Sequence, residues 1–93
     1  MTYRVLMEPA ARRALADLPG EAQGQVLDRI VALADDPRPP RSEPLKGNLA
    51  GLRKLRVRAY RVAYQVDDEA RTVTVWEVGH RSKAYKRLGR RAT

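Results

Sequence analysis

The sequence predicts an α+β domain with the element order β-α-α-β-β-β. Apolar residues in the first third of the chain recur at intervals of three and four, as on helices that bury one stripe. From residue 52 to residue 78 they alternate with polar residues, as on strands that bury one face. A chain of 93 residues argues for one domain, residues 1–93. We therefore expect an antiparallel sheet with a helical hairpin on one face and an open second face.

The N-terminal strand and the two helices have clear boundaries. Residues 3–7 alternate well enough for a strand. Pro9 opens the first helix, because a first-turn position does not need the N–H that proline lacks. Pro19 ends this helix, a second helix begins near Glu21, and it stops before Pro37. The short link between the helices predicts an antiparallel hairpin.

The rest of the chain predicts a meander. Residues 37–44 hold four prolines, so this segment is expected to be a stiff connection and neither a helix nor a central strand. The remaining strands are expected at residues 52–58, 60–67 and 72–78. Residues 67–70 supply the second hairpin turn. After Gly79 we expect a short helix or a basic tail.

Charge is distributed unevenly along the chain. Residues 1–36 carry four basic and six acidic side chains, a balance of −2, whereas residues 37–93 carry fifteen basic and five acidic ones, a balance of +10. Such asymmetry favours one interaction face for nucleic acid, or for an acidic protein that mimics it. A solvated basic surface without a ligand is the alternative.

Several function classes are excluded or disfavoured. Without cysteine the chain can form neither a disulfide nor a thiolate metal site, and one histidine makes a His/Cys metal site unexpected. We predict no metal and no cofactor. The first ten residues lack the apolar core of a signal peptide, and no segment could span a bilayer, so no membrane association and a cytoplasmic location are expected.

Residues 52–65 (LRKLRVRAYRVAYQ) carry the strongest functional signal. The first of the two strands places its cations on one face and its apolar residues on the other: Lys54, Arg56 and Arg58 against Leu55, Val57 and Ala59. A flat positive surface of this kind suits a phosphate backbone. Arg53 and Lys83 extend the predicted phosphate-binding set of Arg56 and Arg58.

Nearly the whole chain resembles the RelE/ParE superfamily of bacterial type II toxins. The segments that carry the resemblance are Leu18-Pro19, Asp36-Pro37, Pro44-Leu45-Lys46-Gly47, Arg56-Val57, Tyr60-Arg61-Val62-Ala63-Tyr64, and Val78-Gly79-His80-Arg81 with Tyr85. RelE-like members cleave messenger RNA in the ribosomal decoding site, and ParE-like members inhibit DNA gyrase. Both are held inactive by an antitoxin encoded beside them. The resemblance thus implies an antitoxin partner, with a toxin–antitoxin hetero-oligomer, and for the RelE-like branch the ribosome and messenger RNA.

The resemblance also implies roles for individual residues in metal-independent RNA cleavage by the ribose 2′-hydroxyl. Arg61 and Arg81 match arginines around the scissile phosphate, and Lys54 matches a lysine that transfers a proton or stabilises charge. Tyr85 matches a tyrosine that stacks on a base or assists proton transfer. His80 is a candidate general acid, because histidine is the side chain type that exchanges protons near neutral pH.

Each assignment has a plainer alternative. The two arginines could bind RNA backbone or an antitoxin carboxylate, Lys54 could be a surface lysine, and His80 and Tyr85 could be structural. The sequence also departs from the RelE-like pattern at two places. Leu52 replaces a second lysine, and Arg58-Ala59 replaces a Gly-Asp turn, so we expect a turn without positive φ.

The sequence is compatible with three functions. The first is a ribosome-dependent messenger RNA endonuclease, favoured by Lys54, Arg61, Arg81 and Tyr85 together. The second is a gyrase inhibitor of ParE type. The third is a nucleic-acid-binding module without catalysis, for which binding would depend steeply on salt.

Overall fold

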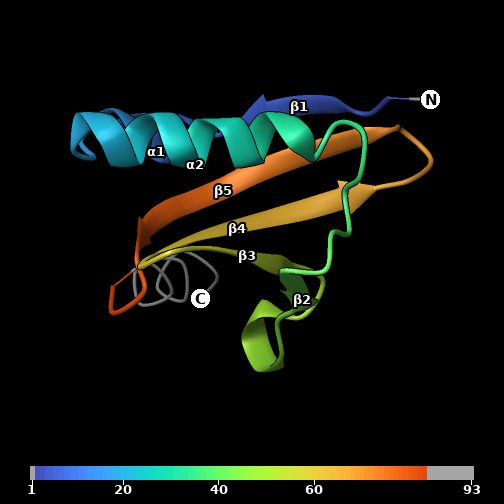
Figure 1. The fold of residues 1–93 in the computed structure, drawn as a ribbon. Coiled ribbons are helices and arrows are strands. Elements are labelled where there is room, and N and C mark those ends of the chain that lie inside the picture. Colours follow the sequence, from blue (N-terminus) through green and yellow to red (C-terminus); the bar gives the residue numbers. More distant parts are fainter. Residues whose placement is uncertain (1, 84–93) are drawn as a thin grey trace.

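The computed structural model describes residues 2–83, which form a five-stranded sheet with two helices on one face (Figure 1). The strand order is β1-β5-β4-β3-β2. The elements in chain order are β1 (Arg4–Met7), α1 (Pro9–Ala16), α2 (Gly20–Ala32), β2 (Ser42–Pro44), the 3₁₀ helix η1 (Gly47–Leu49), β3 (Arg53–Val57), β4 (Tyr60–Asp67) and β5 (Thr72–His80). The predicted α+β class and the helical hairpin are confirmed.

The sheet is mixed rather than purely antiparallel. β1 runs parallel to β5, with Val5 opposite Val73, while the pairs from β5 to β2 are antiparallel. A parallel neighbour requires a crossover connection, and the chain between β1 and β5 contains both helices and the other three strands. The expected all-antiparallel sheet is therefore wrong at this one edge.

β2 is an element that the sequence analysis did not predict. Residues 42–44 pair with β3 so that Glu43 lies opposite Lys54 and Pro44 opposite Arg53. Because β2 is the last strand of the sheet, the prolines around it need not donate to a second neighbour. The exclusion of a helix and of a central strand from residues 37–44 holds, but this connection also contributes an edge strand.

The helical hairpin packs an apolar stripe onto the sheet. Ala11 and Leu15 of α1 are buried, as are Val26 and Ile30 of α2. At the corner between the helices, Gln23 Nε2 donates to the carbonyl oxygens of Leu15 and Ala16 at 3.0 and 3.1 Å. These bonds satisfy carbonyls that the end of a helix leaves without an intrahelical partner. α2 ends at Ala32, a few residues before the predicted boundary.

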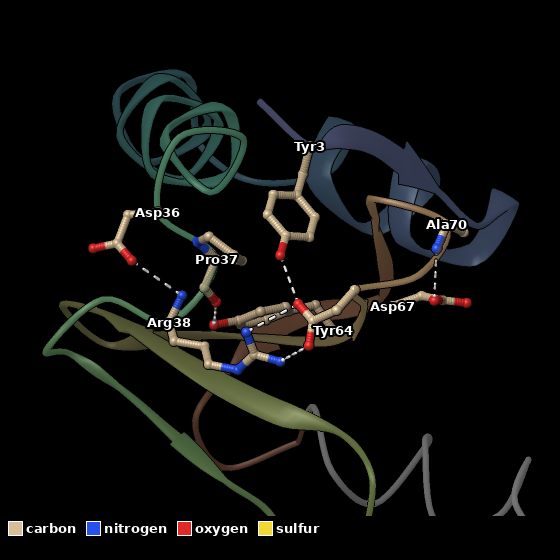
Figure 2. A network of polar contacts seen from close by, with 8 residues as sticks. Tyr3, Asp36, Pro37, Arg38, Tyr64, Asp67 and Ala70 are labelled. Carbon is tan, nitrogen blue, oxygen red and sulfur yellow. Dashed lines mark hydrogen bonds and ion pairs between the residues drawn. The ribbon is translucent and has the colours of Figure 1, made fainter. Parts of the chain in front are cut away.

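The predicted alternation in β3 is confirmed. Leu55 and Val57 belong to the core, whereas Lys54 is half-buried and Arg56 is exposed. Tyr64 of β4 is fully buried in the same core, and its hydroxyl donates to the carbonyl oxygen of Pro37 at 2.7 Å (Figure 2). Leu55, Val57 and Tyr64 therefore make the centre of the helix-covered face apolar, and Lys54 and Arg56 face away from it.

The β3–β4 turn contradicts the prediction that it would avoid positive φ. Arg58 has φ 56°. Val57 pairs with Tyr60, so residues 58 and 59 alone connect the strands, and tight hairpins of this length favour left-handed backbone conformations. The conformation costs a residue with a side chain about 1–2 kcal/mol. Arg61 Nη1 supports the turn by donating to the Arg58 carbonyl oxygen at 2.8 Å.

A polar network closes the opposite end of β4. We call Tyr3, Arg38 and Asp68 the Asp68 network (Figure 2). Both terminal nitrogens of Arg38 donate to the Asp68 carboxylate, at 3.2 and 2.9 Å, and Tyr3 Oη donates to it at 2.6 Å. The Arg71 guanidinium lies 4.7 Å from the centre of the Tyr3 ring. The network joins the N-terminal segment, the connection after α2 and the β4–β5 turn.

Candidate nucleic-acid interface

The sheet face that lies away from the helices, called the open face, gathers cations from β3 and β4, while Ala63 and Glu77 on the same face are buried. Arg56 lies opposite Arg61 and Lys54 lies opposite Ala63, and residues that pair across antiparallel strands share one face. Lys54 is therefore a diagonal neighbour of Arg61. A phosphate at this face would meet Lys54, Arg56 and Arg61 together.

Arg61 is already held in place by the backbone. Its Nη1 donates to the carbonyl oxygens of Arg58 and Tyr60, both at 2.8 Å. A guanidinium carries five N–H donors, so these bonds leave other donors for a phosphate. Arg61, which the family resemblance assigns to the scissile phosphate, therefore has a defined starting position beside the β3–β4 turn.

Arg81, the residue after β5, contacts the same turn. Its backbone N–H donates to the Ala59 carbonyl oxygen at 2.8 Å, and its side chain is exposed. Two residues earlier, Gly79 pairs with Arg61. Arg58, Arg61 and Arg81, which are up to 23 positions apart in the sequence, therefore come together around one two-residue turn.

Lys54 has a partner that sequence reasoning missed. Its Nζ lies 2.9 Å from Oε1 of Glu43, across the β2–β3 pairing. The hydrogen bond from Lys54 holds the pKa of Glu43 below its usual value, and Lys54, Arg56 and Lys46 add favourable charge. This contact follows from the pairing of residues 42–44 with β3. The sequence did not predict that pairing, because prolines argue against a strand in this segment.

His80 lies away from this group. It pairs with Tyr60, and so belongs to the helix-covered side of the sheet, whereas Arg61 pairs with Gly79 and belongs to the open side. The His80 and Tyr60 rings make an edge contact with centroids 6.1 Å apart. Nδ1 of His80 accepts the Ser82 N–H at 3.3 Å. The structure therefore does not bring His80 together with Lys54 and Arg61.

The other predicted residues are dispersed. Arg53 points to the side of the sheet that holds Tyr64, and its Nη2 donates to Ser42 Oγ at 3.0 Å, which ties β3 to β2. Arg58 and Lys83 are exposed. Tyr85 lies outside the described residues, as does the tail from residue 84 onward.

Within residues 2–83, no group of three or more His, Cys, Asp or Glu side chains is placed to hold a metal ion. The helices in this range are all too short or too polar to cross a membrane.

Sequence comparison defines the class of protein. Residues 5–85 match the family described as the ParE toxin of the type II toxin–antitoxin system parDE. The chain is also 37% identical over 89 residues to Toxin RelG of Mycobacterium tuberculosis, a match that covers 94% of this chain and 100% of the relative. The chain belongs to the RelE/ParE superfamily of type II toxins.

Solved structures agree with this membership. The chain resembles a toxin–antitoxin complex, RelBE2, of M. tuberculosis with 34% identity and a TM-score of 0.79, over 87% of this chain and 100% of that one. It resembles the archaeal RelE–RelB complex of Pyrococcus horikoshii with 28% identity and a TM-score of 0.76, over 90% and 100% of the two chains. The isolated Escherichia coli RelE toxin follows, with 27% identity and a TM-score of 0.72, over 98% and 99%.

Proposed function

We propose that this toxin is a messenger RNA endonuclease that acts on the ribosome and needs no metal. The observation that carries the proposal is the arrangement of Arg61 and Arg81 around one turn, at the edge of an open face that also presents Lys54 and Arg56. RelE toxins among the similar structures support the RelE-like branch.

The arginines would bind the scissile phosphate. In the proposed reaction the ribose 2′-oxygen attacks phosphorus, the bond from phosphorus to the 5′-oxygen breaks, and a 2′,3′-cyclic phosphate and a 5′-hydroxyl result. Negative charge accumulates on the phosphoryl oxygens in the transition state. Guanidinium groups of Arg61 and Arg81 would stabilise it through paired N–H donors that never lose their charge.

Proton transfer would involve the ion pair of Lys54 and Glu43. The 2′-hydroxyl must lose a proton, and Glu43 offers an ionised carboxylate beside the cations of the open face. The 5′-oxygen must gain a proton, and the Lys54 ammonium is a donor that lies within 2.9 Å of that carboxylate. Tyr85 stays a predicted base-stacking residue, and His80, on the other side of the sheet, is the weaker candidate for the acid.

An antitoxin is the proposed protein partner, since two of the similar structures are complexes named for a toxin and its antitoxin. An acidic segment laid on the open face would pair with Arg56, Arg61 and Arg81 and thereby exclude RNA. The complex is expected to reside in the cytoplasm, where ribosomes and messenger RNA are found.

Gyrase inhibition is the second candidate, because the matched family is described as ParE toxin. In that case toxicity would persist after Arg61 and Arg81 are replaced, messenger RNA would stay intact, and supercoiling by gyrase would fall.

Primer extension on messenger RNA after brief induction in cells tests the proposal, with Arg81→Ala alongside and Arg13→Ala as the matched control. Arg13 is an exposed arginine on α1, away from the open face. New cuts inside translated codons, present with Arg13→Ala and absent with Arg81→Ala, are expected. Growth arrest with intact messages would reject the nuclease and lead to a gyrase assay.

A further inference from the structure

A second cationic site lies on the helix-covered side of the sheet. It is a pocket of about 280 Å³ lined by Gln25, Asp28, Arg29, Arg41, Val57 and Arg58. Val57 belongs to the core, on the face opposite Lys54 and Arg61. The pocket is therefore distinct from the open face.

Within the described part of the chain, the side chains of the three arginines of this pocket have no partner. Across residues 2–83, the guanidinium groups of Arg29, Arg41 and Arg58 form neither an ion pair nor a hydrogen bond, although Asp28 lines the same pocket. The three arginines and one aspartate give the pocket a formal charge of +2. Like charges that converge without partners oppose folding, so their convergence points to a ligand that supplies negative charge.

The backbone position of each of the three arginines is well defined. Arg29 is on α2, the Arg41 carbonyl oxygen accepts the Arg56 N–H at 3.2 Å, and Arg58 has a left-handed conformation whose carbonyl is held by Arg61. Arginines from α2, from the connection before β2 and from the β3–β4 turn thus line one pocket. Such groups can form paired hydrogen bonds with phosphate oxygens.

We propose that the pocket of Arg29, Arg41 and Arg58 binds a backbone phosphate of RNA. Arg58 occupies the β3–β4 turn and its carbonyl oxygen accepts from Arg61 of β4, so this pocket adjoins the edge of the open face. A strand held at the open face can pass around the β3–β4 turn and place its next phosphates in the pocket. The choice of RNA over another polyanion rests on the proposed function.

Fluorescence anisotropy with a labelled single-stranded RNA tests the pocket. The probe carries 2′-O-methyl groups so that it cannot be cleaved, and the full chain is used. The pocket variant is Arg29→Gln with Arg41→Gln. The matched control is Arg4→Gln with Arg13→Gln, which removes two exposed arginines from β1 and α1. We expect the pocket variant to bind about tenfold more weakly than the control.

The salt dependence gives a second readout. Loss of one phosphate contact to a single strand should reduce the slope of log K against log salt by about 0.7. Asp28→Asn should change affinity in the other direction, about two- to threefold tighter, because it removes the one negative charge lining the pocket. A gain of affinity cannot arise from misfolding.

The opposite results overturn the proposal. Equal losses in the pocket and control variants would mean that only total charge matters. Unchanged binding in the pocket variant would mean that RNA does not enter. Weaker binding of a labelled oligoglutamate with unchanged RNA binding would assign the pocket to a carboxylate-bearing protein. RNA binding through the pocket without messenger RNA cleavage would reject the proposed nuclease and support the pocket. Messenger RNA cleavage together with unchanged RNA binding by the pocket variant would support the nuclease and reject the pocket.

Discussion

The arginines near the two ends of strand β4 differ in whether they form an ion pair. At the β4–β5 turn, Arg38 binds the Asp68 carboxylate through two nitrogens, and Tyr3 donates to the same carboxylate. At the β3–β4 turn, Arg58, Arg61 and Arg81 gather, and within residues 2–83 none of them forms an ion pair. Asp68 neutralises Arg38 at the first end, whereas within residues 2–83 no carboxylate forms an ion pair with the three arginines at the second end.

The difference between the two ends distinguishes charges that hold the fold together from charges that are available for binding. An exposed ion pair such as Arg38–Asp68, with side chains 46% and 57% exposed, adds little to stability, but it joins three segments of the chain. Converging unpaired cations lower stability through repulsion. Such a cluster is expected where a bound ligand, rather than another side chain of the protein, supplies the compensating negative charge.

Replacing both Arg61 and Arg81 should give the largest effect. Arg61→Ala with Arg81→Ala should reduce messenger RNA cleavage by about 10³-fold, because loss of even one oriented donor to a developing anion costs about 10²–10³. Cleavage rates on stalled ribosomes measure this loss. Arg61→Lys keeps the charge but loses the paired donors, so most of the defect should persist.

Thermal unfolding provides the control for that experiment. Arg61 also caps the β3–β4 turn, so its removal should lower Tm by a few degrees at most, and the double variant should stay folded at assay temperature. Cleavage at the wild-type rate in a folded double variant would show that Arg61 and Arg81 do not contribute to catalysis.

Glu43→Gln should give the next largest effect. If Glu43 accepts the 2′-hydroxyl proton, cleavage should fall by about 10²-fold. The control Glu69→Gln removes an exposed carboxylate from the β4–β5 turn. Faster cleavage in Glu43→Gln would instead show that the carboxylate only restrains Lys54.

The titration of Glu43 can be tested without activity. Its pKa is lowered chiefly by the hydrogen bond from Lys54. Lys54→Met should therefore raise the Glu43 pKa toward its usual value, and the folded protein should bind the Glu43 proton at higher pH. Carboxyl NMR chemical shifts against pH measure this, and an unchanged midpoint would show that the ion pair does not form in solution.

The contrast between the two ends was only partly predictable from sequence. Alternation in β3 predicted which cations face away from Leu55, because burial enforces a period of two. The same logic could not predict Arg58 with φ 56°, since that conformation follows from the two-residue hairpin and not from the residue's own preference.

Long-range partners were the larger omission. Glu43 reaches Lys54 through an edge strand among prolines, and Asp68 reaches Arg38 across 30 positions. Neither pairing leaves a periodic signal. The sequence also could not place His80 and Arg61 on opposite faces, because that depends on the register of β5 against β4.

Tyr64→Phe should have a moderate effect on stability alone. It removes the hydroxyl that donates to the Pro37 carbonyl oxygen from a fully buried position. The free energy of unfolding should fall by about 1 kcal/mol, or about 5 °C in Tm. Tyr60→Phe is the matched control, since the Tyr60 hydroxyl has no hydrogen-bond partner within residues 2–83. Equal losses would mean that the Pro37 contact adds nothing.

Asp68→Asn should have the smallest effect, and its pH dependence identifies it. The hydrogen bond from Arg38, and then that from Tyr3, lowers the pKa of Asp68 in the folded state. The ionised carboxylate therefore stabilises the fold above its unfolded pKa of about 3.9, and this contribution is lost as pH falls through the lower folded value. Thermal melts from pH 7 to pH 2 should show wild type and Asp68→Asn converging at acid pH, with wild type slightly more stable near neutrality. Glu69→Gln, which removes a carboxylate from the same turn, should follow wild type throughout. A constant difference in Tm between wild type and Asp68→Asn down to pH 2 would mean that the charge of Asp68 does not stabilise the fold. The ion pair with Arg38 would then not explain the stability of this end of β4.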